Sequence, residues 1–291
     1  MNAAITLALC LSSVVPGTPS AAASDRTVYV TVMDDKREPV PDLTPADFVV
    51  KEGGKEREIV KVERASAPLR LALAVEERMT RDTSVRMGLF EFMKRLAGAG
   101  EIALITIGLR NTTIVDYTTS LEALVGGINK FSMNPSPDSA VAEGVLELAN
   151  KWIDNRPPRG VIVVVALSGG GAGVEPQLVI DRIGQSGATL HAVTLASAGS
   201  APGAAGVGNL ATQSGREMVL GDGPKRSGGR RIDVTVTGAI PKAMLEIAND
   251  ILAQYAITYT LPDGVKPDRR FNASVKRRGL SLRAPSTIPD K

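Results

Sequence analysis

The chain has 291 residues, of which 43% are hydrophobic, 22% are charged and 3% are aromatic. This balance is ordinary for a globular protein and excludes disorder along the whole chain. The formal net charge of +3 is small for this length and argues against a nucleic-acid-binding protein, whose surface usually carries a basic stripe. Because aromatic residues are scarce, the core must consist of Val, Ile, Leu and Ala, which suits a parallel sheet covered by helices on both faces.

Residues 1–23 have the features of a secretory signal peptide. Residues 5–15 are apolar, and three alanines before Ser24 satisfy the small-residue rule for cleavage, although no Lys or Arg precedes the apolar stretch. Cys10, the single cysteine, lies inside this segment, so the mature chain would hold no disulfide and no cysteine nucleophile. We therefore expect a secreted, periplasmic or envelope protein without a membrane span.

The two ends of the mature chain are predicted to be β structure. Residues 27–33 alternate as a strand does, and further strands are expected at residues 49–52 and 58–62, on either side of a Gly-Gly turn. Period-two alternation recurs near the C-terminus, over residues 255–261, 271–275 and 280–283. Neither end could bury a core alone. We expect an N-terminal segment, 24–66, to pair with a C-terminal segment, 255–291, in one small β module.

Residues 67–254 alternate apolar runs with amphipathic segments. Strands are predicted at residues 69–75, 101–107, 161–167 and 189–195, helices at 83–97, 121–131, 139–153, 176–186 and 241–254, and an antiparallel edge strand at 112–117. This alternation predicts an α/β fold with a doubly wound, mostly parallel sheet. Residues 196–231 are rich in Gly, Ala and Ser. We expect a helical turn at residues 210–214 and, for the rest, a mobile loop whose exposed tip is the basic stretch 225–231.

Three stretches carry a family resemblance. Residues 28–34 read Val-Tyr-Val-Thr-Val-Met-Asp and residues 39–48 read Pro-Val-Pro-Asp-Leu-Thr-Pro-Ala-Asp-Phe, while residues 251–259 read Ile-Leu-Ala-Gln-Tyr-Ala-Ile-Thr-Tyr. Together with the order of strands and helices between them, they resemble secreted von Willebrand factor A-related proteins of the type common in acidobacteria. The resemblance covers nearly the whole mature chain and implies a von Willebrand A domain that binds a partner protein and is not an enzyme.

That resemblance also implies where a metal would bind, at the carboxyl tips of the strands. The family pattern there is Asp-x-Ser-x-Ser, a Thr before a helix, and a later Asp, because Mg²⁺ prefers hard oxygen ligands. In this chain Glu76, Arg78 and Thr80 stand at the first tip, Ser139 stands in place of the Thr, and Gly169 stands in place of the later Asp. One carboxylate is lost and a fixed positive charge is introduced. We therefore expect no metal and no cofactor.

The same tips are predicted to form a face that binds a partner protein. Arg78 could pair with Glu76 or with Glu143, or meet an acidic group on the partner directly, although a solvated surface arginine would explain it equally well. Backbone N–H groups of residues 169–173 at a helix start would also favour an acidic group. The residues of this candidate face are Glu76, Glu77, Arg78, Thr80, Ser139, Glu143, Ser168, Gly169 and Gly170.

An enzyme is the alternative. Ser168 follows a strand and precedes small residues, as in a nucleophile elbow, but a catalytic triad needs a histidine and His191, the single one, starts the next predicted strand. The glycines at 169–171 and 173 would suit a phosphate-binding turn, but the Lys-Ser/Thr of a P-loop is missing. A hydrolase-like or nucleotide-binding enzyme that uses Ser168 and the Gly-rich loop stays open at this point.

Overall fold

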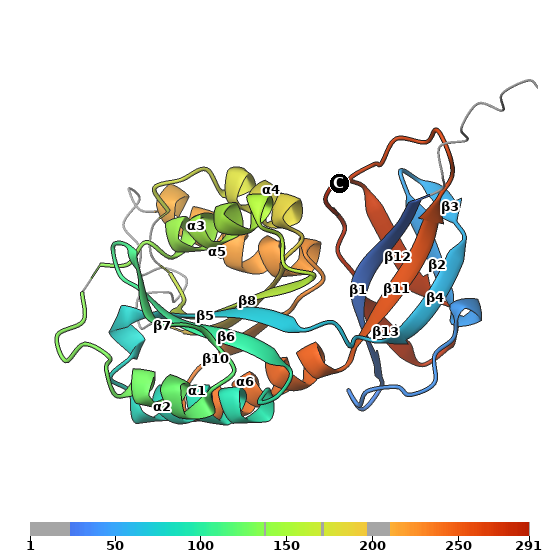
Figure 1. Cartoon of the computed structure of the whole chain (residues 1–291). Helices are drawn as coiled ribbons and strands as arrows, with labels where there is room; N and C mark the ends of the chain where they lie inside the picture. The colour runs from blue at the N-terminus through green and yellow to red at the C-terminus, as the bar shows by residue number, and fades with distance from the viewer. Residues whose placement is uncertain (1–23, 137, 170–171, 197–209, 291) are drawn as a thin grey trace, which may run out of the picture.

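The computed structural model describes residues 24–136, 138–169, 172–196 and 210–290. These residues form an α/β domain and a β module that lie side by side (Figure 1). The chain passes from the β module into the α/β domain between β4 (Ile59–Arg64) and β5 (Leu69–Glu76). It returns between α6 (Ile240–Leu252) and β11 (Gln254–Leu261). No helix among these residues is long and apolar enough to cross a membrane.

The α/β domain is built on a six-stranded sheet. All neighbouring strands are parallel except the pair at one edge, which is antiparallel. The strand order is β10 (Arg231–Val234), β9 (Thr189–Leu195), β8 (Arg159–Leu167), β5, β6 (Gly100–Ile107) and β7 (Asn111–Thr118). The prediction of a mostly parallel α/β sheet with an antiparallel edge strand is confirmed, and β8, the most apolar strand, lies in its interior.

Helices cover both faces of this sheet. One layer holds α1 (Thr83–Arg95), α2 (Leu121–Ile128) and α6, and the other holds α3 (Val141–Asp154), α4 (Pro176–Ser186) and α5 (Leu210–Arg226) (Figure 1). Because successive side chains of a strand point to opposite faces, β5 contributes side chains to the cores under both helix layers. Its Leu71 and Leu73 join the core under the first layer, whereas Ala72 and Ala74 join the core under the second.

The prediction of a mobile loop over residues 196–231 is wrong for its described part. Residues 210–226 form α5, and Arg231 begins β10, which pairs in parallel with β9. The glycines that suggested a loop allow close packing instead: a Cβ on Gly223 would lie 2.9 Å from Leu190. The basic stretch is also no free tip, because Arg230 pairs with Asp250 and Arg231 with Glu217. Residues 197–209 lie outside the described residues.

The β module contains strands from both ends of the chain. Its larger sheet has the order β13 (Leu280–Arg283), β1 (Ser24–Asp34), β11 and β4, and its smaller sheet the order β12 (Phe271–Val275), β2 (Phe48–Glu52) and β3 (Lys55–Arg57). N-terminal β1 pairs with C-terminal β11 from Ser24↔Leu261 to Thr31↔Gln254. The predicted pairing of the two ends is confirmed. Their apolar faces enclose one shared core, which includes Val30, Val50, Ile257, Tyr259 and Phe271.

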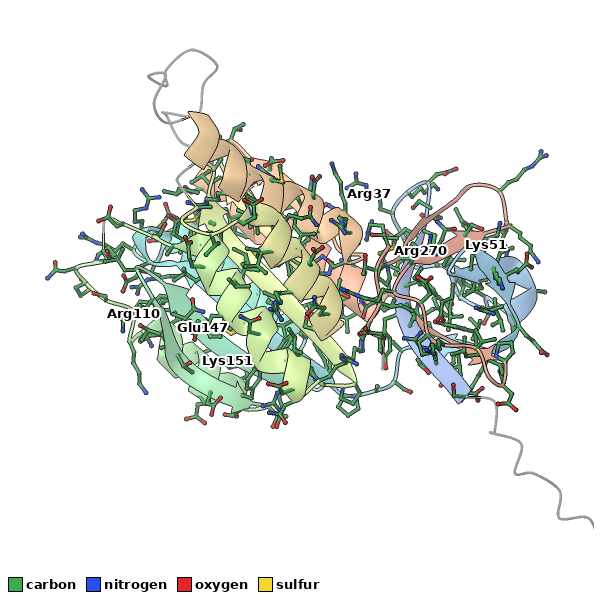
Figure 2. All side chains as sticks on the ribbon, turned by 90° about the horizontal axis from the view of Figure 1, so that it is seen from above. Arg37, Lys51, Arg110, Glu147, Lys151 and Arg270 are labelled. Carbon is green, nitrogen blue, oxygen red and sulfur yellow. The ribbon has the colours of Figure 1, made fainter. Side chains whose placement is uncertain are left out.

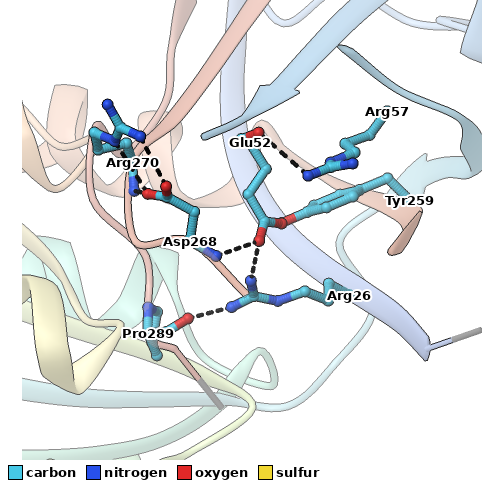
Figure 3. A network of polar contacts seen from close by, with 7 residues as sticks. All are labelled: Arg26, Glu52, Arg57, Tyr259, Asp268, Arg270 and Pro289. Carbon is cyan, nitrogen blue, oxygen red and sulfur yellow. Dashed lines mark hydrogen bonds and ion pairs between the residues drawn. The ribbon is translucent and has the colours of Figure 1, made fainter. Parts of the chain in front are cut away.

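A buried carboxylate fixes the two sheets of the module to each other (Figure 3). Glu52 of β2 is fully buried and accepts hydrogen bonds from the Arg26 guanidinium at 2.8 Å, the Tyr259 hydroxyl at 2.7 Å and the Asp268 backbone N–H at 2.7 Å. Burial raises the pKa of Tyr259, and the hydrogen bond to Glu52 raises it further, so this phenol stays protonated. Arg26 also donates to the Pro289 carbonyl, which ties the C-terminal residues to β1.

Candidate functional site

The predicted sites gather at the end of the sheet that lies away from the β module (Figure 1). The parallel strands start next to the β module and end at this opposite edge, because β5 follows directly from β4. We call the loops that follow these strand ends, together with the loop before α3, the tip face. It consists of the described residues within 77–82, 108–110, 129–140, 168–175 and 235–239.

Glu76, the last residue of β5, lies at the centre of this edge with no exposed side-chain surface. Its Oε1 accepts hydrogen bonds from the Ser139 hydroxyl at 2.6 Å and from Arg78 Nε at 2.8 Å and Nη2 at 2.5 Å. Its Oε2 accepts hydrogen bonds from the Leu167 backbone N–H at 2.7 Å and from Arg216 Nη2 at 2.6 Å. Strand ends, a loop and a helix are therefore joined through one carboxylate.

These contacts determine the charge of Glu76. Burial alone would raise the pKa of the carboxyl group, but the Arg216 charge and the hydrogen bonds from Ser139, Arg78 and Leu167 outweigh burial and lower the pKa below its ordinary value. The carboxylate is therefore ionised at neutral pH. Two guanidinium groups face one carboxylate, so the cluster of Glu76, Arg78 and Arg216 carries one excess positive charge.

Arg216 was not among the residues predicted from the sequence, because its segment was interpreted as a loop. It lies on the buried side of α5, and none of its side chain is exposed. Nη2 bonds both Glu76 and the Leu167 carbonyl, at 2.6 and 2.7 Å, while Nε and Nη1 have no partner among the described residues. A signal was present: residues 216, 219, 220 and 223 repeat at the spacing of a buried helical stripe.

The arrangement around Glu76 does not fit a divalent cation. Both carboxylate oxygens already accept hydrogen bonds from guanidinium groups, and a metal would have to displace Arg78 or Arg216. Among the described residues, no three His, Cys, Asp or Glu side chains are placed to hold a metal ion. Mg²⁺ and Ca²⁺ require several oxygen ligands, whereas here two of the carboxylate's four partners are guanidinium groups and a third is a backbone N–H.

The other predicted residues occupy separate positions. Glu77 accepts a hydrogen bond from the Ser136 backbone N–H at 3.1 Å and holds the loop before α3 against the first tip. Thr80 is fully buried and its hydroxyl donates to the Glu77 carbonyl at 2.7 Å. The expectation that Thr80 contributes to the face is therefore wrong. Within the described residues, Arg78 forms its salt bridge with Glu76 and not with Glu143.

In the Gly-rich loop, the N–H groups of Gly169 and Gly173 are not free. The Gly169 N–H donates to Glu217 Oε1 at 3.2 Å, and the Gly173 N–H donates to Glu143 Oε1. Carboxylates at these two amides would repel a phosphate or an acidic partner. The expectation that residues 169–173 attract an acidic group, and the nucleotide-binding alternative, are contradicted at both amides. Gly170 lies outside the described residues.

The hydrolase alternative fails on geometry. The Ser168 backbone N–H bonds the Leu195 carbonyl at 2.7 Å, at the end of β9, whereas His191 lies four residues back in the same strand, opposite Val163. At the rise of a β-strand, four residues separate His191 from Leu195 by about 13 Å. That distance is too long for a direct hydrogen bond between His191 and Ser168. His191 is fully buried, and burial lowers its pKa to about 3. The Ser–His pair that the hydrolase alternative would require is therefore not formed, as the position of His191 in the sequence indicates.

No family model matches the sequence, and no curated protein matches it. The chain is similar to a solved von Willebrand factor type A protein from Catenulispora acidiphila, with a TM-score of 0.47 and 8% identity over 94% of this chain and 76% of that one. It is also similar to the vWF domain of the type V pili tip protein Mfa5 from Porphyromonas gingivalis, with a TM-score of 0.46 and 11% identity over 64% of this chain and 96% of that one.

A third similar solved structure is an aerotolerance-related membrane protein from Bacteroides fragilis. Its TM-score is 0.44 at 12% identity, over 63% of this chain and 99% of that one. Likenesses at this level of identity and score carry no information about what this chain binds. The structural neighbours include von Willebrand A domains. The function of this chain has to be inferred from the tip face itself.

Proposed function

We propose that the chain is a secreted protein of the von Willebrand factor A-related type that binds a partner protein through its tip face, without a metal and without catalysis. The signal-like residues 1–23 and the sequence stretches at both ends of the mature chain support the assignment. The tip face lies at the far end of the α/β domain from the β module, so a partner could approach it unobstructed by the module (Figure 1).

The observation that carries this proposal is the position of three apolar side chains. Met133, Leu109 and Val236 are 70%, 67% and 61% exposed, the highest values among the large hydrophobic residues of the described chain. All three lie on the tip face, in the loops after α2, β6 and β10. We interpret the presence of all three at one end of the domain as a sign of an interaction surface, although they do not form one contiguous patch.

These side chains are spread over an area of suitable size. Leu109 and Val236 follow β6 and β10, which are four strand spacings apart in the sheet, or about 19 Å. A typical protein interface buries roughly 800 Å² on each partner, so one partner could cover both. Arg78, whose side chain is 36% exposed, follows β5 between them.

The charges of the face indicate the chemistry of the partner. Arg78 and the exposed Arg110 lie among the apolar side chains, and Figure 2 shows Arg110 at the end of the molecule remote from the β module. The cluster of Glu76, Arg78 and Arg216 has an excess positive charge. A partner whose acidic group reaches Arg78 and Arg110, away from the carboxylates at Gly169 and Gly173, and whose apolar side chains surround that group would complement both features.

A photo-crosslinking experiment tests the proposal. A photoreactive amino acid is placed at Met133 or Val236, and the cells that naturally express the chain are irradiated. We expect the same partner to be captured from both positions. The control position is Met87 in α1, which is 55% exposed but lies on the side of the domain. Capture from Met87 and not from the tip positions would contradict the proposal.

The captured partner then allows a charge test. We expect Arg78→Glu to weaken its binding at least tenfold at low salt, where a charge contact is strongest. Arg70→Glu is the matched control, because Arg70 is 42% exposed and its strand, β5, begins at the opposite end of the domain. Equal affinities of the wild-type protein and Arg78→Glu would remove Arg78 from the binding face.

A further inference from the structure

A cavity of about 90 Å³ lies between the α/β domain and the β module, at the opposite end of the sheet from the tip face. Residues 156–160, which lead into β8, and residues 187–189 at the start of β9 line one side. Residues 27–29 of β1 and residues 287–289 near the C-terminus line the other side. A ligand in this cavity would therefore touch both parts of the protein.

One wall of the cavity is formed by a buried cation. Arg159 is 5% exposed, and its guanidinium donates to Gln254 Oε1 at 2.9 Å, to the Ala65 carbonyl at 3.3 Å and to the Ile251 carbonyl. All three acceptors are uncharged, and no carboxylate contacts this guanidinium within the described residues. Burial lowers the pKa of Arg159 below its ordinary value, although the group stays protonated.

The three carbonyl oxygens hold the Arg159 side chain in position, but they do not neutralise its positive charge. A guanidinium has five N–H donors, and the three contacts use only part of them. Burial of a charge without a counter-charge is costly, and the negative end of α6, where Ile251 lies, offsets only a fraction of a unit charge. An anion in the adjoining cavity would supply both the remaining acceptors and the missing charge.

A second arginine lies at the same cavity. Arg156 is exposed, its Nη2 donates to the Gln185 carbonyl at 2.9 Å, and it also lines the cavity. Partial burial lowers the pKa of Arg156, the charge of Asp290 opposes this lowering, and the charge of Arg26 adds to it. The lining also includes four residues with hydroxyl groups: Thr27, Thr189, Ser227 and Thr287.

We propose that this cavity binds a small oxyanion, held between the guanidinium groups of Arg159 and Arg156. The two fixed positive charges exclude a cation. A cavity of about 90 Å³ has room for a small ion such as phosphate, sulfate or a short carboxylate. Because the ligand would contact both the domain and the module, its binding would stabilise their present arrangement.

Thermal unfolding and calorimetric titration of the full mature chain test this site. Sodium phosphate, sulfate and acetate are each compared with sodium chloride at equal ionic strength. We expect saturable binding of at least one oxyanion and a rise in Tm of roughly 3–5 °C at ten times its Kd. The three anions distinguish tetrahedral oxyanions from carboxylates as ligands. A Tm that depends on ionic strength alone would overturn the proposal.

Variants locate the binding in the cavity. We expect Arg156→Gln to weaken oxyanion binding at least tenfold with little effect on folding, because Arg156 is exposed. Arg159→Lys keeps the buried charge but loses the planar fork, and it should weaken binding as well. Arg110→Gln on the tip face is the control and should bind as the wild type does. Unchanged oxyanion affinity in both Arg156→Gln and Arg159→Lys would place the ligand elsewhere and refute the site, whatever the outcome at the tip face.

Discussion

Arg216 Nη2 lies 2.6 Å from Glu76 Oε2, and neither side chain has any exposed surface. The two residues are far apart in the sequence and belong to different elements, β5 and α5. Where the resembling family has a metal to gather strand ends and loops, this chain has a carboxylate held by two arginines. The pair therefore joins β5 to α5 beneath the tip face.

Glu76→Gln is expected to destabilise the protein by about 3–5 kcal/mol, because it leaves Arg216 charged and buried without its counter-ion. The free energy of unfolding is measured by urea denaturation. Glu147→Gln is the control, since it removes the acid of an exposed ion pair with Lys151 on α3 (Figure 2) and should cost less than about 1 kcal/mol. A similar small loss in both variants would show that the Glu76–Arg216 pair contributes little.

A double-mutant cycle measures the coupling of the same pair. Arg216→Met alone leaves Glu76 with only Arg78 as a charged partner, whereas Glu76→Gln combined with Arg216→Met removes both buried charges. We expect the double variant to be more stable than the sum of the single losses predicts, by at least about 2 kcal/mol. Additive losses in urea denaturation would mean that the two charges do not interact.

His191 should make the stability depend on pH between neutrality and mild acid. Burial lowers its pKa to about 3 in the folded state, and the positive charges of Arg283 and Arg230 contribute to this lowering; in the unfolded chain the pKa is about 6.5. As the pH falls below 6.5, His191 becomes protonated in the unfolded chain but stays neutral in the folded protein. The free energy of unfolding therefore decreases. From pH 7 to pH 5 this loss amounts to about 2 kcal/mol.

His191→Leu tests this dependence, because the chain contains no other histidine. Both ring nitrogens lack a partner among the described residues, so the leucine variant should be about as stable as the wild type at pH 7. Between pH 7 and pH 5 it should lose about 2 kcal/mol less than the wild type. Parallel pH profiles of the two proteins in urea denaturation would refute the buried, neutral state of His191.

Divalent cations should not bind at the tip face. The expectation from the sequence stays a prediction, and the contacts of Glu76 with Arg78 and Arg216 give it a physical reason. Titration calorimetry with Mg²⁺ and with Ca²⁺ should give no heat of binding, and EDTA should leave the Tm unchanged. A micromolar, EDTA-sensitive site that disappears in Glu76→Gln would contradict it.

The sequence alone determined the fold class and the pairing of the chain ends. Apolar runs such as residues 161–167 can be buried only inside a sheet covered on both faces, and β segments at each end lacked a core that only the other end could provide. These conclusions depend on local periodicity and on the need to bury apolar surface. Both can be recognised from the order of the residues along the chain.

The sequence also suggested which strand ends carry the candidate face, because the carboxyl ends of parallel strands meet at one edge. It did not indicate which charges pair there. Arg216 was missed because the glycines around it resemble a loop, although they allow α5 to pack closely against its neighbours. It was also missed because its partner, Glu76, is 140 positions away.

Only the tertiary structure decided the chemistry of the tip face. It brings Glu217 and Glu143 to the amides of Gly169 and Gly173, so these two amides are not open to an anion. It also places Arg159 at a cavity that residues from both parts of the protein enclose. Such contacts join residues with no periodic relation in the sequence, and their free energies depend on distance and burial. For that physical reason these contacts could be identified only from the folded structure.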